Sequence, residues 1–153
     1  MMLAVIRIRG SVNTRKEIND TLKMLRLPYV NNCVLAEDKP EIKGMIEKCK
    51  DYVTFGEIDK ETLVKMLEKR LRLKSDRRID EKALKEITGF SSYEEFADML
   101  IQGSVRLTGF KVLQPNFRLT PPSKGFKSIN QHYPKGDIGN RGKKVNSLIE
   151  SMI

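Results

Sequence analysis

The sequence contains few of the residues that build disulfides, metal centres and nucleophile relays. Its 153 residues include two cysteines, one histidine and no tryptophan. Cys33 and Cys49 form no CxxC pair, so we exclude a disulfide-stapled secreted domain and expect a reducing cytoplasm. One histidine and two unclustered cysteines nearly exclude a tetrahedral zinc site, and we expect neither a metal nor a cofactor.

Long apolar runs are also missing. No stretch approaches the roughly 18 residues that span a bilayer, and no basic helix shows the strong apolar face that binds a membrane surface. The opening MMLAVIRIRG is too short for a secretory signal and has no small-residue cleavage site. We therefore expect no signal sequence and no membrane partner.

Enzyme motifs are absent from the sequence. Gly136, Gly139 and Gly142 are evenly spaced, but G-x-x-G-x-x-G is not the dinucleotide fingerprint and is typical of a flexible basic turn. His132 has no evident partners for a nucleophile relay. The run RGSVN at 9–13 could cradle an anion at a helix N-terminus, as in small phosphatases, but no residue is indicated as a general base. We expect no enzymatic activity and no small-molecule substrate.

Positive charge is what the sequence has in excess, with 29 Lys and Arg against 20 Asp and Glu and a formal net charge of +9. Residues 1–56 carry a net +3, residues 57–102 carry −1, and residues 103–153 carry +7 with only two acids. Aromatic residues recur among the bases of this last third: Phe110, Phe117, Phe126 and Tyr133. We expect it to lie along a polyanion, nucleic acid first; the alternative is a basic tail that is merely solvated.

Hydrophobic periodicity over the first 56 residues predicts an α+β unit of order β-α-β-α-β. The elements are a strand over 3–9, a helix from Asn13 or Thr14 to before Pro28, a strand over 32–37, a helix from Pro40 to Cys49 and a strand over 52–56. In the first strand, Ala4, Ile6 and Ile8 are expected to face the core, and Val5, Arg7 and Arg9 to face outward. We expect a two-layer fold with both helices on one face of a three-stranded sheet.

The rest of the chain divides into a helical and an irregular part. Three helices are predicted to begin near Asp59, Asp80 and Ser91 or Ser92. Dense Gly and Pro from 104 to 141 predict an extended segment with at most short strands at 105–107 and 116–119, followed by a helix over 142–153. We therefore expect three parts: a core over 1–57, a helical extension over 58–103, and a basic arm with a C-terminal helix over 104–153.

Three blocks of the first third resemble a known family: IRIRGSVNTRKEINDTLKMLRL, NNCVL and DKPEIKGMIEKCKDYVTFGEI. The last block contains a distinctive D-x-P-x-x-x-G-M-I core, formed by Asp38, Pro40, Gly44, Met45 and Ile46. These blocks are similar to the universal large-ribosomal-subunit protein family that is numbered thirty in bacteria and archaea and seven in eukaryotes. FRLTPPSKGFKS and GDIGNRGKKVNSLI resemble the longer archaeal and eukaryotic form, and the lack of a long basic N-terminal extension favours the archaeal type.

The resemblance implies more than the residues show by themselves. It implies a three-stranded antiparallel sheet related to ferredoxin-like folds. It also implies a structural component of the large (50S) subunit of cytoplasmic ribosomes, with large-subunit rRNA and neighbouring ribosomal proteins as partners. Catalytic activity and a required metal are not properties of this family. The core over 1–57 would then be the RNA-binding core.

A hypothesis for RNA contact follows from the bases, because A-form RNA presents mainly shape, phosphates and 2′-OH groups. One backbone stretch would be held near the first loop by Arg7, Arg9, Arg15 and Lys16. Another would be held by Arg26, Asn31, Asn32 and Lys43, with Gly44 allowing close approach. The path of the arm would be lined by Arg118, Lys124, Lys127, Lys135, Arg141, Lys143 and Lys144. The rings expected to stack on unpaired bases are those of Phe126, His132 and Tyr133.

Two other functions stay open from the sequence. A free-standing regulator that binds mRNA or DNA would use the same basic surface, although no recognition helix or pair of stacking aromatics of the RNA-recognition-motif type is visible. A small phosphatase-like hydrolase would use the 9–13 loop and would lose turnover on Arg9→Ala.

Overall fold

The computed structural model describes residues 2–153, and its first part has the predicted order of elements. The elements are β1 (Met2–Arg7), α1 (Lys16–Met24), β2 (Asn32–Glu37), α2 (Pro40–Lys48) and β3 (Val53–Glu57). Pro40 occupies the first turn of α2, where its missing N–H costs nothing. The α+β class and the β-α-β-α-β order of the first third are therefore confirmed.

Three helices follow and the chain then becomes irregular, as predicted. The elements are α3 (Lys60–Arg70), α4 (Glu81–Thr88), α5 (Tyr93–Ile101), the 3-10 turn η1 (Leu107–Gly109), β4 (Asn116–Arg118), β5 (Gly139–Asn140), the 3-10 turn η2 (Gly142–Lys144) and α6 (Val145–Met152). The strand expected at 116–119 is confirmed as β4. The strand expected at 105–107 is wrong: the chain turns in η1, which buries Leu107 and brings Phe110 edge-on to Phe96 at 5.9 Å.

The sheet has five strands rather than the expected three, in the order β4-β2-β1-β3-β5. Central β1 is antiparallel to both neighbours, with Ile6 opposite Cys33 of β2 and Thr54 of β3. The irregular arm adds the two outer strands: β4 is antiparallel to β2, and β5 is parallel to β3. Strands at the two free edges supply partners for backbone groups that a three-stranded sheet would leave open.

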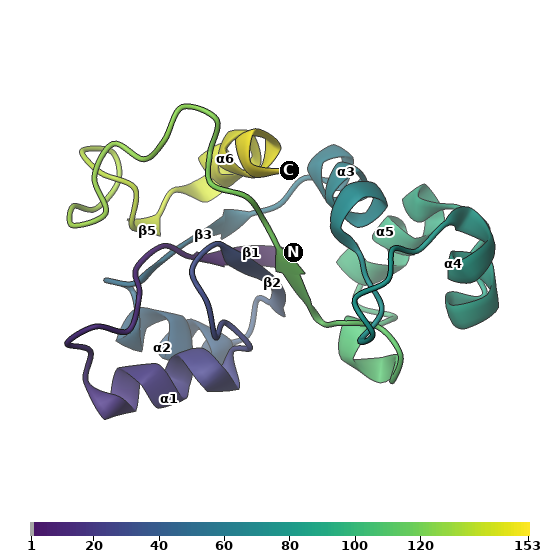
Figure 1. Ribbon diagram of the computed structural model, residues 1–153, viewed down its shortest axis with the longest axis horizontal. Helices are drawn as coiled ribbons and strands as arrows, with labels where there is room; N and C mark the ends of the chain where they lie inside the picture. The colour runs from purple at the N-terminus through teal and green to yellow at the C-terminus, as the bar shows by residue number, and fades with distance from the viewer. Residues whose placement is uncertain (1) are drawn as a thin grey trace.

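Helices cover both faces of the sheet (Figure 1), so the two-layer expectation is wrong for the whole chain, although α1 and α2 lie on one face as expected. The face carrying Leu3 and Val5 packs against α1 and α2. The opposite face, carrying Ala4 and Ile6, packs against α3 and α6, with α5 beside α3. Consequently β1 is buried on both sides, and Val5 and Arg7, which were expected to face outward, are only 0% and 3% exposed.

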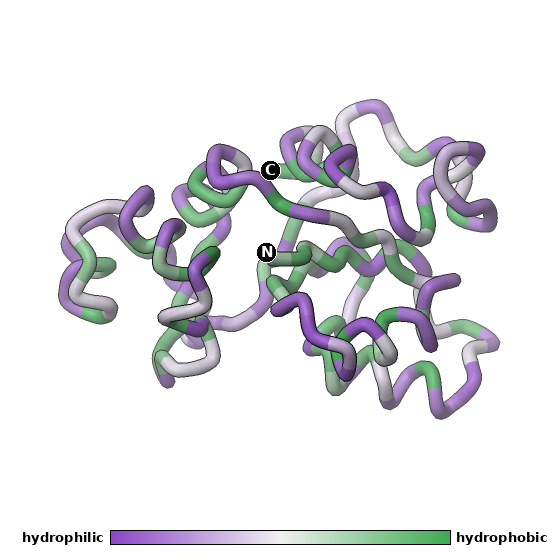
Figure 2. The backbone as a smooth tube through the Cα atoms, turned by 180° about the vertical axis from the view of Figure 1, so that it is seen from behind, coloured by the Kyte–Doolittle hydropathy of each residue, from purple (hydrophilic) through white to green (hydrophobic). Residues whose placement is uncertain are grey.

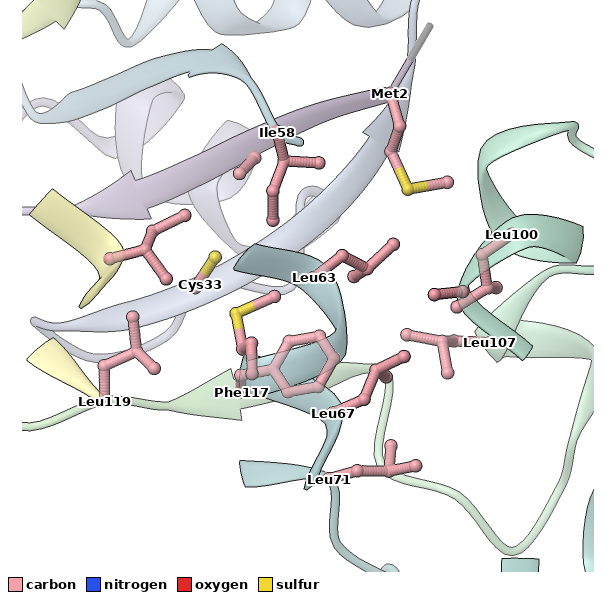
Figure 3. Packing of buried hydrophobic residues seen from close by; sticks show 14 of the residues in the cluster. Met2, Cys33, Ile58, Leu63, Leu67, Leu71, Leu100, Leu107, Phe117 and Leu119 are labelled. Atoms are coloured by element: carbon pink, nitrogen blue, oxygen red, sulfur yellow. The ribbon is translucent and has the colours of Figure 1, made fainter. Parts of the chain in front are cut away.

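One hydrophobic cluster joins the sheet, the middle helices and the arm (Figure 3). Phe117 of β4 is fully buried among Leu63 and Leu67 of α3 and Cys33 of β2. The arm is therefore anchored in the core by an aromatic side chain rather than attached only at its ends. Figure 2 shows that the central strands are hydrophobic and that the outer loops are mainly hydrophilic.

Both cysteines are buried, as expected of small hydrophobic residues. Burial raises the pKa of the Cys33 thiol to about 12 and that of the Cys49 thiol to about 11. The thiols therefore stay protonated near neutral pH, which makes them poor nucleophiles.

Candidate nucleic-acid interface

The loops that carry the predicted contact residues meet at one end of the sheet. Because β1 is antiparallel to its neighbours, its end lies beside the starts of β2 and β3. The loop 8–15, the turn 28–31, residues 49–52 and the arm loop 124–137 form what we call the sheet-end surface (Figure 1). Backbone hydrogen bonds connect these loops, from Ile8 N to Tyr52 O at 2.9 Å and from Asn31 N to Arg7 O at 2.8 Å.

Arg7 supports this surface from inside. Its Nη1 donates to the carbonyl oxygens of Leu27 and Pro28 at 2.8 and 2.9 Å, and its Nε donates to the carbonyl of Arg9 at 2.9 Å. Burial lowers the pKa of the guanidinium, which remains charged because arginine starts so high. The side chain faces carbonyls that the turn would otherwise leave unpaired, so Arg7 positions the loops and does not lie on the surface where a phosphate would reach it.

Arg9 and His132 lie on either side of a short segment before β3. The Arg9 guanidinium sits over the Tyr52 ring at 5.0 Å from the ring centre. His132 Nε2 lies 2.9 Å from Asp51 Oδ1, with about half of each side chain exposed. The structure thus brings together a cation from the first loop, a ring from the arm and Tyr52. Such a mixture of charge and π-surface suits a backbone phosphate beside an unpaired base.

Arg141 was expected on the surface but is buried in a network that fixes the arm to β3. Its Nη2 donates to Asp137 Oδ1 at 3.0 Å and to the Asp137 carbonyl at 2.9 Å, and its Nε donates to Thr54 Oγ1 at 2.9 Å. Asp137 Oδ2 accepts hydrogen bonds from the backbone N–H groups of Lys127 and Ser128. The ion pair therefore shapes the loop 124–137, and Arg141 positions other residues in the same way as Arg7 does.

The arm loop presents its remaining bases and one ring outward. Lys124, Lys127 and Lys135 are exposed. Tyr133 is 37% exposed, and its ring is supported by Arg141 at 5.3 Å. Phe126, expected to stack on a base, instead packs partly buried against the hydrophobic core.

The loop needs glycine where it approaches β5. Gly139 has a φ of +85°, and a Cβ there would lie 2.6 Å from His132 Nδ1. His132 therefore owes its position to this glycine. The evenly spaced glycines of this region are not a merely flexible turn, because at Gly136 a Cβ would likewise meet the Gln131 carbonyl oxygen at 2.1 Å.

Arg15 and Lys16 lie at the start of α1 and are both exposed. No side chain caps this helix end. Two cations at the positive end of the helix dipole are unfavourable by themselves, and Glu17 in the first turn offsets only part of this. An anion bound at this point would compensate them.

Four further predicted residues lie in β2, in the turn before it and on α2. Asn32 is buried within β2, and Asn31 sits in the turn before it with a φ of 68°. Lys43 pairs with Asp38 at 2.8 Å. A Cβ on the exposed Gly44 would meet no atom within 4 Å, so the close approach expected there is not made by the protein itself.

Three further predicted bases are exposed on the arm. Lys143 and Lys144 are in η2, beside β3. Arg118 extends from β4 toward Asp76, with Nη1 3.5 Å from Oδ1, and so belongs to a different part of the surface.

Sequence reasoning missed two tyrosines of the sheet-end surface. Tyr29 is 70% exposed in the turn before β2, and the Arg9 guanidinium lies over the ring of Tyr52. Their signal was present, because Tyr29 lies three residues before the strand predicted over 32–37 and Tyr52 begins the strand predicted over 52–56, at the same end as the first loop. The neighbouring Val12 is 87% exposed, which adds apolar surface to this end of the protein.

Two other kinds of site are not found within residues 2–153. No helix there is long and apolar enough to cross a membrane. No group of three or more His, Cys, Asp or Glu side chains there could hold a metal ion.

The fold and the sheet-end surface define a basic α+β protein whose exposed cations and rings gather on loops, the arrangement of a polyanion-binding protein. Residues 3–53 match the family model described as ribosomal protein L30p/L7e. The chain is 44% identical over 151 residues to the large ribosomal subunit protein uL30 of Archaeoglobus fulgidus, with 99% of both chains covered. It is 43% identical over 152 residues to the protein of that name from Methanocorpusculum labreanum, again with 99% of both covered. The protein of that name from Thermoplasma volcanium is 44% identical over 153 residues, covering 99% of this chain and 93% of the other. The chain belongs to the L30p/L7e family, in its archaeal type.

Proposed function

We propose that this protein is a structural constituent of the large ribosomal subunit in the cytoplasm, and that it binds folded rRNA through the sheet-end surface. Likeness over nearly the whole chain to proteins named large ribosomal subunit protein uL30 supports the ribosomal role. The grouping of exposed bases and rings on loops that Arg7 and Arg141 hold from inside supports the contact surface.

The proposed contacts divide into two kinds. Exposed or half-exposed bases neutralise phosphates: Arg9, Arg15, Lys16, Lys124, Lys127 and Lys135. Exposed rings at the same end meet unpaired bases: Tyr29, His132 and Tyr133. We include Lys143 and Lys144 as flanking phosphate contacts and leave Arg7 and Arg141 as positioning residues. Neighbouring ribosomal proteins are further expected partners.

A salt titration tests the phosphate contacts. Eight neutralised phosphates, six at the sheet-end surface and two at its flank, give a slope of about −6 to −7 for log affinity against log salt concentration. The variant Arg15→Gln/Lys16→Gln/Lys135→Gln should reduce the magnitude of that slope by about 2 to 3. The matched control, Lys48→Gln/Lys82→Gln/Lys85→Gln, removes three exposed lysines that form no ion pair within residues 2–153, and should leave the slope nearly unchanged. A wild-type slope near −1 on large-subunit rRNA fragments would contradict the proposal.

Sedimentation separates the ribosomal role from a free-standing regulator. The full-length protein should co-migrate stoichiometrically with large subunits in a sucrose gradient, whereas a regulator would stay mainly in lighter fractions.

The hydrolase alternative receives no support from the 9–13 loop. Its polar groups hold the loop itself, with Arg7 Nη2 3.4 Å from Ser11 Oγ and Thr14 Oγ1 donating to the Gly10 carbonyl at 3.4 Å.

A further inference from the structure

The end of α3 and the connection to α4 form a strongly basic hairpin that lies outside the sheet-end surface. Residues 69–78, here called the basic hairpin, carry six bases and one acid, Asp76. The hairpin is held by hydrogen bonds from Leu73 N to Arg77 O at 3.0 Å and from Asp76 N to Leu73 O at 2.9 Å. It is also bound to the segment before β4, where Lys74 N donates to Val112 O at 2.9 Å. These bases are therefore displayed on a fixed support.

The acids close to the basic hairpin balance only part of its charge: Asp76 lies within it, Glu68 lines a hollow with Lys69, Arg70 and Arg78, and Asp80 and Glu81 follow it. Asp76 is shared between Arg72 at 3.3 Å and Arg118 at 3.5 Å. Arg70 donates to the carbonyl of Arg118 at 3.2 Å. The other four bases are exposed and form no ion pair with any acid in residues 2–153: Lys69, Lys74, Arg77 and Arg78. Like charges held this close repel one another in the free protein, so the arrangement favours a bound anion.

A groove extends this charge toward α1. Lys74 lies across a hollow of about 340 Å³ from Lys23 and Arg26. The remaining lining residues are neutral: Pro28, Gln114, Pro115 and Asn116. Asn116 Nδ2 donates to the Arg26 carbonyl at 3.2 Å, which ties the two walls together. Three cations therefore converge on a groove that no carboxylate lines.

The chemistry of the basic hairpin differs from that of the sheet-end surface. The hairpin contains no aromatic residue, and none lines the groove. Without rings to stack on bases, this surface recognises phosphates alone, which suits an RNA duplex whose bases are already stacked and paired. A lipid surface is less suitable, because a site that binds a membrane interface needs a continuous apolar face. Beside the hairpin, the exposed Val112, at 53%, does not form such a face by itself.

We propose that the basic hairpin and the groove it forms with Lys23 and Arg26 are a second RNA-contact surface, which takes the sugar–phosphate backbone of a duplex. It lies beside the β4 edge of the sheet, whereas the arm loop lies beside β5 at the opposite edge (Figure 1), so the protein bridges two RNA segments of different kinds. This inference rests on the proposed rRNA-binding function and adds a second surface with its own ligand.

The test uses full-length protein, a 20-bp RNA duplex and a 12-nucleotide unpaired RNA, with binding followed by fluorescence anisotropy across a salt series. The hairpin variant is Lys74→Gln/Arg77→Gln/Arg78→Gln. Three lost phosphate contacts should weaken duplex binding on the order of 10²-fold at 0.1 M salt and reduce the slope magnitude by about 2 to 3. Affinity for the unpaired RNA should change by less than about threefold. The sheet-end variant, Arg15→Gln/Lys16→Gln/Lys135→Gln, should weaken binding to the unpaired RNA and leave duplex binding nearly unchanged. The Lys48→Gln/Lys82→Gln/Lys85→Gln control should weaken binding to neither RNA.

The outcomes separate this inference from the proposed function. If wild-type protein bound neither RNA, the proposed function itself would fail. If wild type bound the duplex and the hairpin variant matched the control, the second surface would be refuted while the proposed function stood. If the hairpin variant kept duplex affinity but no longer co-sedimented with large subunits, the hairpin would contact an acidic protein instead, and the proposal would be overturned.

Discussion

Arg141→Ala gives the sharpest test of how the arm is held. The Arg141 and Asp137 side chains are only 7% and 11% exposed, so the substitution leaves a carboxylate in the interior without its cation. Removing one partner of a buried ion pair costs about 3–5 kcal/mol. Asp137 keeps its backbone donors at Lys127 and Ser128, which places the expected loss of unfolding free energy near 3 kcal/mol.

Denaturant unfolding of the full chain, followed by circular dichroism, measures this loss. For a domain of this size, 3 kcal/mol corresponds to a decrease in Tm of about 6–12 °C. Thr54→Val removes the neutral acceptor of Arg141 and the donor to the Gly139 carbonyl at 3.0 Å, and should cost about 2 kcal/mol. The double variant Arg141→Met/Asp137→Asn leaves no unpaired buried charge, so its cost should fall well below the sum of the two single changes. A loss below 1 kcal/mol for Arg141→Ala, or strict additivity in the double variant, would refute the reasoning.

Three further perturbations test the support of the surface and the buried thiols. Arg7→Met leaves the Leu27 and Pro28 carbonyls without their donor, so it should cost about 2–3 kcal/mol in denaturant unfolding and weaken rRNA binding in a filter assay; unchanged stability would show that the guanidinium does not support the turn. Gly139→Ala should cost at least about 1 kcal/mol and raise hydrogen exchange in the arm loop, because the new Cβ meets His132 at a φ of +85°; retained protection would count against the close approach. Burial in the folded protein raises the pKa of the Cys33 and Cys49 thiols from the ordinary value of 9.0 to about 12 and about 11. Their protonated forms therefore favour the folded state, and the unfolding free energy should fall as the pH rises from about 9 through that range. A Cys33→Ala/Cys49→Ala variant with the same alkaline fall in stability would exclude the thiols as its cause.

Local periodicity was sufficient to predict the β-α-β-α-β order, because every element of it lies within a short window of sequence. The outer strands were harder to predict, since they depend on pairing across long separations. Asn32 pairs with Arg118, and Thr54 pairs with Gly139. A short β4 carries too little alternation to indicate its partner, and two residues of β5 carry none. The three-stranded prediction failed for this reason.

Arginine burial was the other limit. Alternation in β1 placed Arg7 on the face opposite Ile6 and Ile8. A side chain on that face is exposed only when the sheet has one solvated face. Here α1 and α2 cover the second face, so Arg7 is buried although it lies on the side opposite Ile6. The Asp137 and Arg141 pair was visible at i and i+4, but that spacing indicates an ion pair only on a helix, and these residues lie in an extended segment.

Charge counting missed the basic hairpin because of the length over which it was averaged. Residues 57–102 sum to −1, which concealed six bases within residues 69–78. The acids that balance the sum lie mostly along α3, α4 and α5, and three of them, Glu68, Asp80 and Glu81, flank the cluster of bases. A ten-residue window would have shown the cluster, although not the groove that it forms with α1, since that depends on tertiary packing.

Backbone pairing at both edges of the sheet also bears on the contact that we propose between the arm and RNA. From the sequence, the arm was expected to be an extended segment that lies along a polyanion, with at most short strands. Instead β4 and β5 are paired within the protein, and Phe117 is buried in its core. The conformational entropy of ordering these segments is then lost during folding rather than during binding, so less of the interaction energy with RNA is spent on ordering the arm. Binding should accordingly resemble the docking of a preformed surface, with only the exposed side chains of the loops losing freedom.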